Sequence, residues 1–187
     1  MPNKSEIKDT PFDKYVNQAI KKWPNVPKCY GWLQLSRRGE WLIKGEKIPH
    51  KRTIEFFKAN YRVASDGYSY VQNGPQQVFV DLEYTPWIYR FDHHAGFSTH
   101  SDLIVHDILD AMSDEHGNLL IETSLGIGLI DDRDLSALSS FLTESGAELN
   151  TLKYLDSLIE ITSISTDQII AKYAFKQKPT STDENAI

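Results

Sequence analysis

Apolar residues recur at helical spacing near the start of the chain and again after Pro49. Between residues 12 and 23 they fall at i, i+3, i+4 and i+7, which predicts an amphipathic helix. Pro24 and Pro27 end it, because proline cannot continue a helix. A second helix is predicted in the segment HKRTIEFFKANY, which follows Pro49 and tolerates a proline at its start.

Alternating apolar positions predict strands in the rest of the first half. Residues 30–35 and 41–43 flank a charged Arg-Arg-Gly turn and predict a hairpin. Two further strands flank an Asn-Gly-Pro turn at residues 73–75, and another strand is expected at 87–89.

The second half has a similar pattern. A strand is predicted from about residue 103 to 112, with a turn after it and a return strand at 119–121. The segment GLIDDRDLSALSSFL then predicts a helix capped by Asp131 or Asp132, whose carboxylates accept unpaired N–H groups of the first turn.

The C-terminal segment is ambiguous. Leucines at 152, 155 and 158 allow a helix, whereas residues 158–164 and 169–175 alternate like paired strands. We favour strands from about residue 157 onward, followed by a frayed tail at 176–187.

A hairpin followed by a helix therefore occurs twice, which predicts an internal duplication. Three residues match at a constant offset of 78, and the offset grows to 84 at the helix, as six inserted residues would produce. The matched pairs are Gly39 with Gly117, Leu42 with Leu120, Ile43 with Ile121 and, in the helix, Phe57 with Phe141.

These patterns predict an α+β fold with two small subdomains, each an antiparallel sheet with a helix. The polar, turn-rich segment DHHAGFSTHS favours a boundary near residue 95. The expected organisation is an N-terminal helix and arm at 1–25, subdomains at 26–95 and 96–175, and a flexible tail at 176–187.

Composition narrows the class of protein. The 187 residues include 40% hydrophobic residues and one cysteine, Cys29, which excludes an intrachain disulfide and a thiolate-cluster zinc site. No apolar run approaches the roughly twenty residues that a membrane-spanning helix needs, and no secretory signal is evident. We expect a cytoplasmic protein without membrane contact.

Charge is divided unequally along the chain. The net charge is -6, but residues 1–60 carry 13 Lys/Arg against 6 Asp/Glu, and the remainder carries 7 against 20. The split is typical of two halves that attract each other, or of a basic face for an anionic ligand. The acidic balance argues against nucleic acid as a partner.

The segment VFVDLEYTPWIYR is the densest in functional residue types. Alternation places Asp81 and Glu83 on one face of a strand, where two carboxylates suit acid/base work or a divalent cation. A solvated strand face explains them equally simply. The sequence has no catalytic motif such as G-x-S-x-G or a complete dinucleotide-binding fingerprint.

Five histidines lie within 24 residues, and such clusters occur in metal sites. Their spacings of 1, 6, 6 and 10 do not match the fixed helical or turn spacing that zinc ligands need, and exposed or packing histidines are the simpler interpretation. The five are His93, His94, His100, His106 and His116.

The chain resembles an uncharacterised bacterial family, domain of unknown function 1285 or a close sibling of it. The resemblance spans about residues 30–142 and rests on GEWLIKGEKIPHKRTIEFF, on the strands leading to VDLEYTPW and on GLIDDRDLSAL. It implies an α+β fold with an internal duplication, a C-terminal half like pleckstrin-homology folds, and a ligand-binding or signalling role. The family's His-Pro near the second helix is replaced here by Arg133-Asp134-Leu135, so no site is carried over there.

Together these features predict a non-enzymatic ligand-binding or signalling module with a site for a small anionic ligand between its halves. A partner protein is the other partner considered. Asp81, Glu83, Trp87 and Arg133 would line the site, with Arg133 pairing an anion and Trp87 stacking on the ligand. No catalytic residue, metal or cofactor is predicted, and the oligomeric state is left open.

Two alternatives remain open. One is a metal-dependent hydrolase that uses Asp81, Glu83 and some of the nearby histidines. The other is a protein-interaction domain whose tryptophans and tyrosines form an apolar patch.

Overall fold

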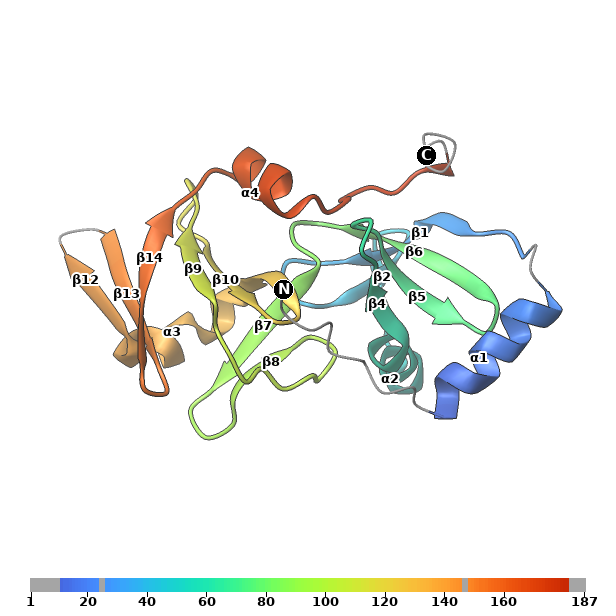
Figure 1. Ribbon diagram of the computed structural model, residues 1–187, viewed down its shortest axis with the longest axis horizontal. Helices are drawn as coiled ribbons and strands as arrows, with labels where there is room; N and C mark the ends of the chain where they lie inside the picture. Colours follow the sequence, from blue (N-terminus) through green and yellow to red (C-terminus); the bar gives the residue numbers. More distant parts are fainter. Residues whose placement is uncertain (1–10, 24–25, 146–147, 182–187) are drawn as a thin grey trace, which may run out of the picture.

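The computed structural model describes residues 11–23, 26–145 and 148–181. The chain forms two mixed β-sheets side by side, with short helices at their edges and ends (Figure 1). This is the predicted α+β class with two sheet subdomains. The helices are α1 (Pro11–Lys22), α2 (Lys51–Asn60), α3 (Leu135–Leu138) and α4 (Thr166–Tyr173), with short 3-10 turns η1 (Asp132–Asp134) and η2 (Ser139–Phe141) on either side of α3.

The first sheet has six strands in the order β3-β2-β1-β6-β5-β4. The predicted hairpins form at both turns. The prediction of a purely antiparallel sheet is wrong, because β1 lies parallel to β6 and the long connection through α2 permits that pairing. The strands are β1 (Cys29–Leu35), β2 (Trp41–Ile43), β3 (Glu46–Lys47), β4 (Tyr61–Val63), β5 (Ser69–Asn73) and β6 (Gln76–Leu82).

The second sheet has eight strands in the order β12-β13-β14-β9-β10-β11-β7-β8, with parallel pairs β14–β9 and β11–β7. It is therefore mixed as well, again in contrast to the prediction. The strands are β7 (Trp87–Asp92), β8 (Gly96–Thr99), β9 (Asp110–Ser113), β10 (Leu119–Thr123), β11 (Gly126–Ile130), β12 (Leu142–Ser145), β13 (Glu148–Tyr154) and β14 (Ser157–Ser163).

The polar segment at 92–101 is a hairpin of the second sheet. Asp92 accepts hydrogen bonds from the backbone N–H groups of His94 and Ala95, and β8 then pairs with β7. The chain crosses between the sheets at residues 83–86, upstream of the boundary expected near 95. The division into subdomains at the predicted positions stays a prediction.

The strand predicted from residue 103 begins only at Asp110. The strand starts later because Thr99 forms a local turn. Its hydroxyl accepts the N–H groups of Ser101 and Leu103, and its own N–H donates to the Leu103 carbonyl. This local turn satisfies the backbone without a sheet partner. A single β-bridge, Ser98 with Ile104, is what remains of the expected pairing.

The prediction of a second C-terminal strand at 169–175 is also wrong, because residues 166–173 form α4. Ser165 and Gln168 make a capping box, in which each side chain accepts a backbone N–H of the other residue. These two reciprocal bonds start a helix where apolar alternation alone suggested a strand.

Residues 174–178 run from α4 back across the first sheet and are called the strap below (Figure 1). The Lys176 N–H donates to the Gly67 carbonyl, and the Gln177 carbonyl accepts the Leu82 N–H at 2.7 Å. Phe175 is buried. The start of the predicted frayed tail is therefore fixed to the first sheet, while residues 182–187 lie outside the described part.

One apolar core runs through both sheets. It joins Leu33, Trp41 and Val80 of the first sheet to Leu120 and Ile130 of the second in one cluster of contacting buried residues. Among the described helices, none has the length and apolar character needed to span a membrane.

Both segments of the predicted duplication form a hairpin followed by a helix. β2 and β3 precede α2, and β10 and β11 precede η1 and α3. The strands of the second hairpin are longer than those of the first, and the internal duplication stays a prediction.

Candidate functional site

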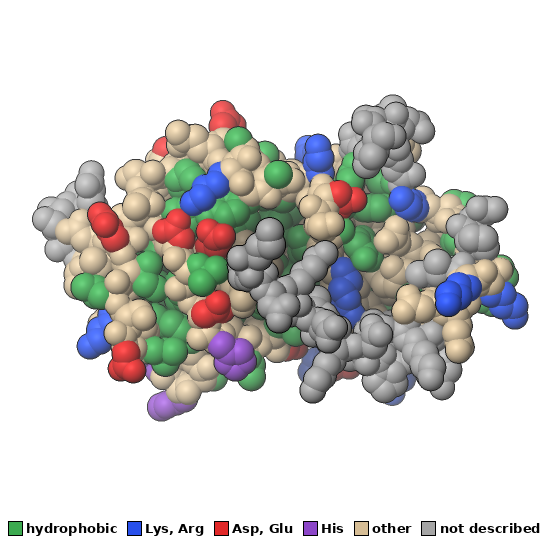
Figure 2. All heavy atoms as spheres, in the orientation of Figure 1, with side chains coloured by type: hydrophobic (Ala, Val, Ile, Leu, Met, Phe, Trp, Pro, Cys, Tyr) green, Lys and Arg blue, Asp and Glu red, His purple; other side chains and the backbone are tan. Residues whose placement is uncertain are grey.

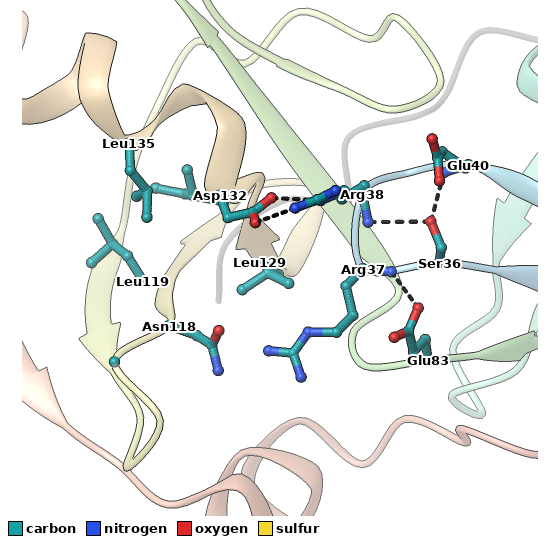
Figure 3. Close-up of a pocket in the computed structure, with 12 residues that line it drawn as sticks. Ser36, Arg37, Arg38, Glu40, Glu83, Asn118, Leu119, Leu129, Asp132 and Leu135 are labelled. Carbon is teal, nitrogen blue, oxygen red and sulfur yellow. Dashed lines mark hydrogen bonds and ion pairs between the residues drawn. The ribbon is translucent and has the colours of Figure 1, made fainter.

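A cavity of about 390 Å³ lies where the two sheets meet. The β1–β2 turn forms one wall, and the β9–β10 turn with the end of β11 forms the other (Figure 3). Polar and charged residues line the first wall, and leucines of the second sheet close the other side. The lining residues used below are Arg37, Arg38, Glu40, Glu83, Asn118, Leu119, Leu129, Asp132 and Leu135.

The Arg37 guanidinium projects into the cavity on the side of Asn118 (Figure 3). Its Cζ lies 4.8 Å from the centre of the Tyr84 ring, a cation–π contact. The Arg37 backbone N–H donates to Glu83 at 2.9 Å, which fixes the turn while the side chain extends away. Within the described residues, this guanidinium contacts no carboxylate.

Tyr84 is held in place from the second sheet. Its hydroxyl donates to the Asp114 carboxylate at 2.6 Å, and the Asn118 side-chain amide donates to the same carboxylate at 2.7 Å. Desolvation by burial acts to raise the pKa of Asp114, but these hydrogen bonds outweigh it and lower that pKa. The stacking surface under Arg37 is therefore anchored by an ionised side chain.

The aspartates at 131, 132 and 134 are all engaged in hydrogen bonds within the protein, and Asp132 joins the second sheet to the first. Arg38 makes two hydrogen bonds to the Asp132 carboxylate, at 2.9 and 2.7 Å, which lower the pKa of Asp132. Asp134 accepts from Arg90 at 2.7 Å and from the Phe91 N–H at 3.0 Å. Asp131 caps η1 through the Arg133 N–H, which confirms the predicted cap.

The structure brings together two of the four residues predicted to bind a ligand. Asp81 and Glu83 line a second cavity of about 320 Å³ on the other side of the β1–β2 turn, together with Lys178. Desolvation raises the pKa of Asp81, and the charge of Lys178 opposes that rise. Glu83 also lines the larger cavity, so it lies between the two.

The other two predicted residues line neither cavity. Trp87 is 6% exposed, and its Nε1 donates to the Leu125 carbonyl at 2.8 Å. The Arg133 guanidinium binds the Asp131 carboxylate and the Arg38 carbonyl. Both side chains are therefore engaged within the protein, and a ligand-binding role for them stays a prediction.

The histidines considered for the alternative hydrolase do not gather. His93, His94 and His106 are exposed, whereas His100 is buried against the rings of Trp41 and Tyr61. Across residues 11–23, 26–145 and 148–181, no three His, Cys, Asp or Glu side chains are placed to hold a metal ion.

His100 has an unusual environment. Burial, and to a smaller degree the charge of Lys58, lowers its pKa to about 3. Its Nδ1 accepts the Ile88 N–H at 3.3 Å, while Nε2 has no hydrogen-bond partner. The imidazole is therefore neutral and part of the junction between the sheets.

The sequence reasoning missed Arg37 and Asn118 as site residues. The charged Arg-Arg-Gly turn predicts a hairpin, and its two adjacent arginines give the same local signal. Nothing local distinguishes an arginine that pairs across the junction from one that does not. Only the tertiary structure separates the two arginines, by placing Arg37 against Tyr84, which lies 47 positions later in the chain.

Crystal structures of DUF1285 family proteins align with part of this chain. The crystal structure of a DUF1285 family protein from Silicibacter pomeroyi DSS-3 aligns with a TM-score of 0.51 at 15% identity, covering 75% of this chain and 85% of that one. A DUF1285 family protein from Shewanella baltica OS155 aligns with a TM-score of 0.42 at 14% identity, covering 58% and 90%. No curated protein matches the chain.

The likeness to the Silicibacter pomeroyi protein shows a shared fold and confirms the resemblance to the DUF1285 family. The model of a different family, DUF2944, described as "Protein of unknown function (DUF2946)", matches residues 12–180. That match covers nearly the whole chain. The chain therefore belongs to the DUF2944 family and shares its fold with a member of the DUF1285 family.

Proposed function

We propose that the chain is a non-enzymatic ligand-binding or signalling module that holds a small anionic ligand in the cavity between its sheets. The observation that carries this proposal is the Arg37 guanidinium, which projects into the cavity without a carboxylate partner among the described residues. Its neighbours at the junction, Arg38, Arg90 and Arg133, each bind an aspartate.

An arginine in this position suits an oxyanion. The planar guanidinium presents parallel N–H donors that match carboxylate and phosphate oxygens. Its stacking on Tyr84 limits its conformations, so less entropy is lost when a ligand binds. Asn118 lies on the same side of the cavity and adds a neutral hydrogen-bonding group.

The proposal includes two further features: an internal duplication, and a likeness of the C-terminal half to pleckstrin-homology folds. The recurrence of a hairpin and helix supports the duplication. A site at the junction of two such units is where residues from both copies meet. A cytoplasmic location is likewise proposed, from the single cysteine at position 29.

Arg37→Gln tests the site. We expect small anions such as succinate, citrate or inorganic phosphate to raise the melting temperature of the parent protein, and at least one to bind in calorimetry. Arg37→Gln should weaken that binding by about tenfold or more, because a charge-assisted hydrogen bond contributes roughly 1.5–3 kcal/mol.

Arg52→Gln is the matched control, since it removes the same charge from an exposed position at the start of α2. It should bind the anion like the parent. Equal affinity in the Arg37 and parent proteins, or no binding by any of the three anions, would contradict the proposal.

The exposed Trp32 favours a second candidate, a protein-interaction domain. Half of its surface is exposed, and Lys44 lies over its ring at 3.9 Å. Tryptophan is enriched at the centres of protein interfaces. This surface lies on β1 and the β2–β3 turn, so both functions are compatible with one molecule.

A further inference from the structure

The cavity wall carries two opposite charges that have no counterion among residues 11–23, 26–145 and 148–181. Arg37 is the cation, and Glu83 is the anion: its carboxylate accepts the Arg37 backbone N–H and contacts no Lys, Arg or His side chain within the described ranges. The remaining charges are neutralised, since Arg38 pairs with Asp132 and Glu40 with Lys47 at 2.8 Å.

Arg37 and Glu83 do not neutralise each other. The Glu83 carboxylate turns toward the backbone of the β1–β2 turn, and the Arg37 guanidinium extends in another direction toward Asn118 (Figure 3). The site therefore offers a cationic and an anionic contact at separate points of one cavity.

Leucines form the apolar part of the opposite wall, beside Asn118 and Asp132. Leu119, Leu129 and Leu135 line it, and the first two are almost fully buried. Leucine side chains provide no hydrogen bond, so the part of a ligand that faces them must be hydrocarbon. The volume of about 390 Å³ is at the small end of the range for ligand pockets.

We infer that the ligand is a zwitterion of the amino-acid type with an apolar side chain. Its carboxylate pairs with Arg37, its ammonium group pairs with Glu83, and its hydrocarbon chain contacts the leucine wall. This inference rests on the proposed function and specifies its ligand class. A ligand that carries only an anionic group still pairs with Arg37 but leaves Glu83 without a partner, so it binds more weakly than the zwitterion.

Three probes of one carbon skeleton test the inference by calorimetry. L-Leucine carries both charges, 4-methylpentanoate lacks the ammonium group, and 3-methylbutylamine lacks the carboxylate. The parent protein should bind leucine about tenfold or more tightly than either truncated probe, since each lost charged contact is worth at least that factor.

Two variants assign the contacts. Glu83→Gln should remove the preference for leucine over 4-methylpentanoate, while it keeps the acceptor for the Arg37 N–H. Arg37→Gln should remove the preference for leucine over 3-methylbutylamine. Glu55→Gln, on the exposed face of α2, is the matched control and should keep both preferences.

The outcomes separate this inference from the proposed function. If 4-methylpentanoate binds as tightly as leucine and Arg37→Gln weakens both, the anion site stands and the zwitterion inference is wrong. If none of the three probes binds, the inference is also wrong, and the three anions used for the proposed function decide that proposal independently.

Discussion

Arg37 and Arg38 are neighbours in the chain, yet the structure gives them different roles. Arg38 binds Asp132 across the junction, with both side chains more than half exposed. Exposed ion pairs contribute little to stability because solvent screens them. Arg37 instead projects into a cavity over Tyr84. Residue type alone therefore does not predict the role of an arginine in this turn. The role depends on the group that each side chain contacts.

His100 makes a prediction at this scale. Its pKa is about 3 in the folded protein against 6.5 for an unperturbed histidine, so only the unfolded chain takes up a proton between these values. Stability is therefore full above pH 6.5 and is lost as the pH falls toward 3, by about 1.4 kcal/mol per pH unit. Urea unfolding between pH 4.5 and 6.5 measures this slope.

The groups around His100 do not stabilise the positive charge that protonation of its imidazole would create. Lys58 is a cation paired with Asp102 at 2.9 Å, and Tyr61 donates its hydroxyl to the Pro86 carbonyl. His100→Gln should flatten the slope, whereas His94→Gln, at an exposed position, should leave it unchanged. Equal slopes in parent and His100→Gln proteins would show that His100 does not control this range.

At the scale of elements, α4 and the strap act as one connector between the sheets. The capping box fixes where α4 begins, and Tyr173 donates to Glu122 of β10 at 2.7 Å. The strap then bonds to Gly67 and Leu82 of the first sheet. A segment that looks polar and terminal in the sequence thereby ties the end of the chain to its first half.

Gly67 makes the prediction for the strap. It has φ +87°, and a Cβ there would lie only 2.2 Å from the Ala174 carbonyl oxygen. Gly67→Ala should therefore lower the free energy of unfolding by roughly 2–4 kcal/mol, of which the left-handed backbone accounts for about 1–2 and the clash for the rest. Gly74→Ala, with φ +55° and no neighbour within 4 Å, should show the backbone cost alone.

Hydrogen exchange distinguishes the mechanism. In Gly67→Ala the amides of Lys176 and Leu82, which bond across the strap contact, should lose protection. If the two glycine variants were equally stable, close approach of the strap would not be a determinant of stability.

At the scale of the whole molecule, ion pairs and a shared apolar core both join the two sheets. On the face in Figure 2, acidic side chains gather over the half that carries the second sheet, while Lys and Arg lie mainly over the other. The pairs Arg38–Asp132 and Lys58–Asp102 connect the basic start of the chain to its acidic remainder. The unequal charges of the sequence thus meet at the junction.

The continuous core predicts cooperative unfolding. Buried residues of both sheets contact each other in one cluster, so exposing one sheet exposes apolar surface of the other. Urea transitions followed by tryptophan fluorescence and by far-ultraviolet circular dichroism should coincide. Two separated transitions would instead show that the sheets unfold independently.

The sequence by itself determined the local elements. Apolar periodicity located α1, α2 and the hairpins around residues 36–40 and 74–75, because these depend on turn residues and side-chain alternation close together in the chain. It also gave the fold class, the Asp131 cap and the family resemblance. It erred at residues 103–109 and at α4, where side-chain bonds to the backbone outweigh periodicity.

Tertiary structure alone decided the parallel pairings, the strap and the cavity. Each depends on residues far apart in sequence: β1 meets β6, Gln177 meets Leu82, and Arg37 meets Tyr84. Glu83 was found from its alternation with Asp81, which is a local pattern, although β6 ends at Leu82 and Glu83 lies one residue beyond it. Arg37 was not, because its lack of a carboxylate partner in the described part of the chain arises only when the second sheet supplies aspartates to its neighbours and none to it.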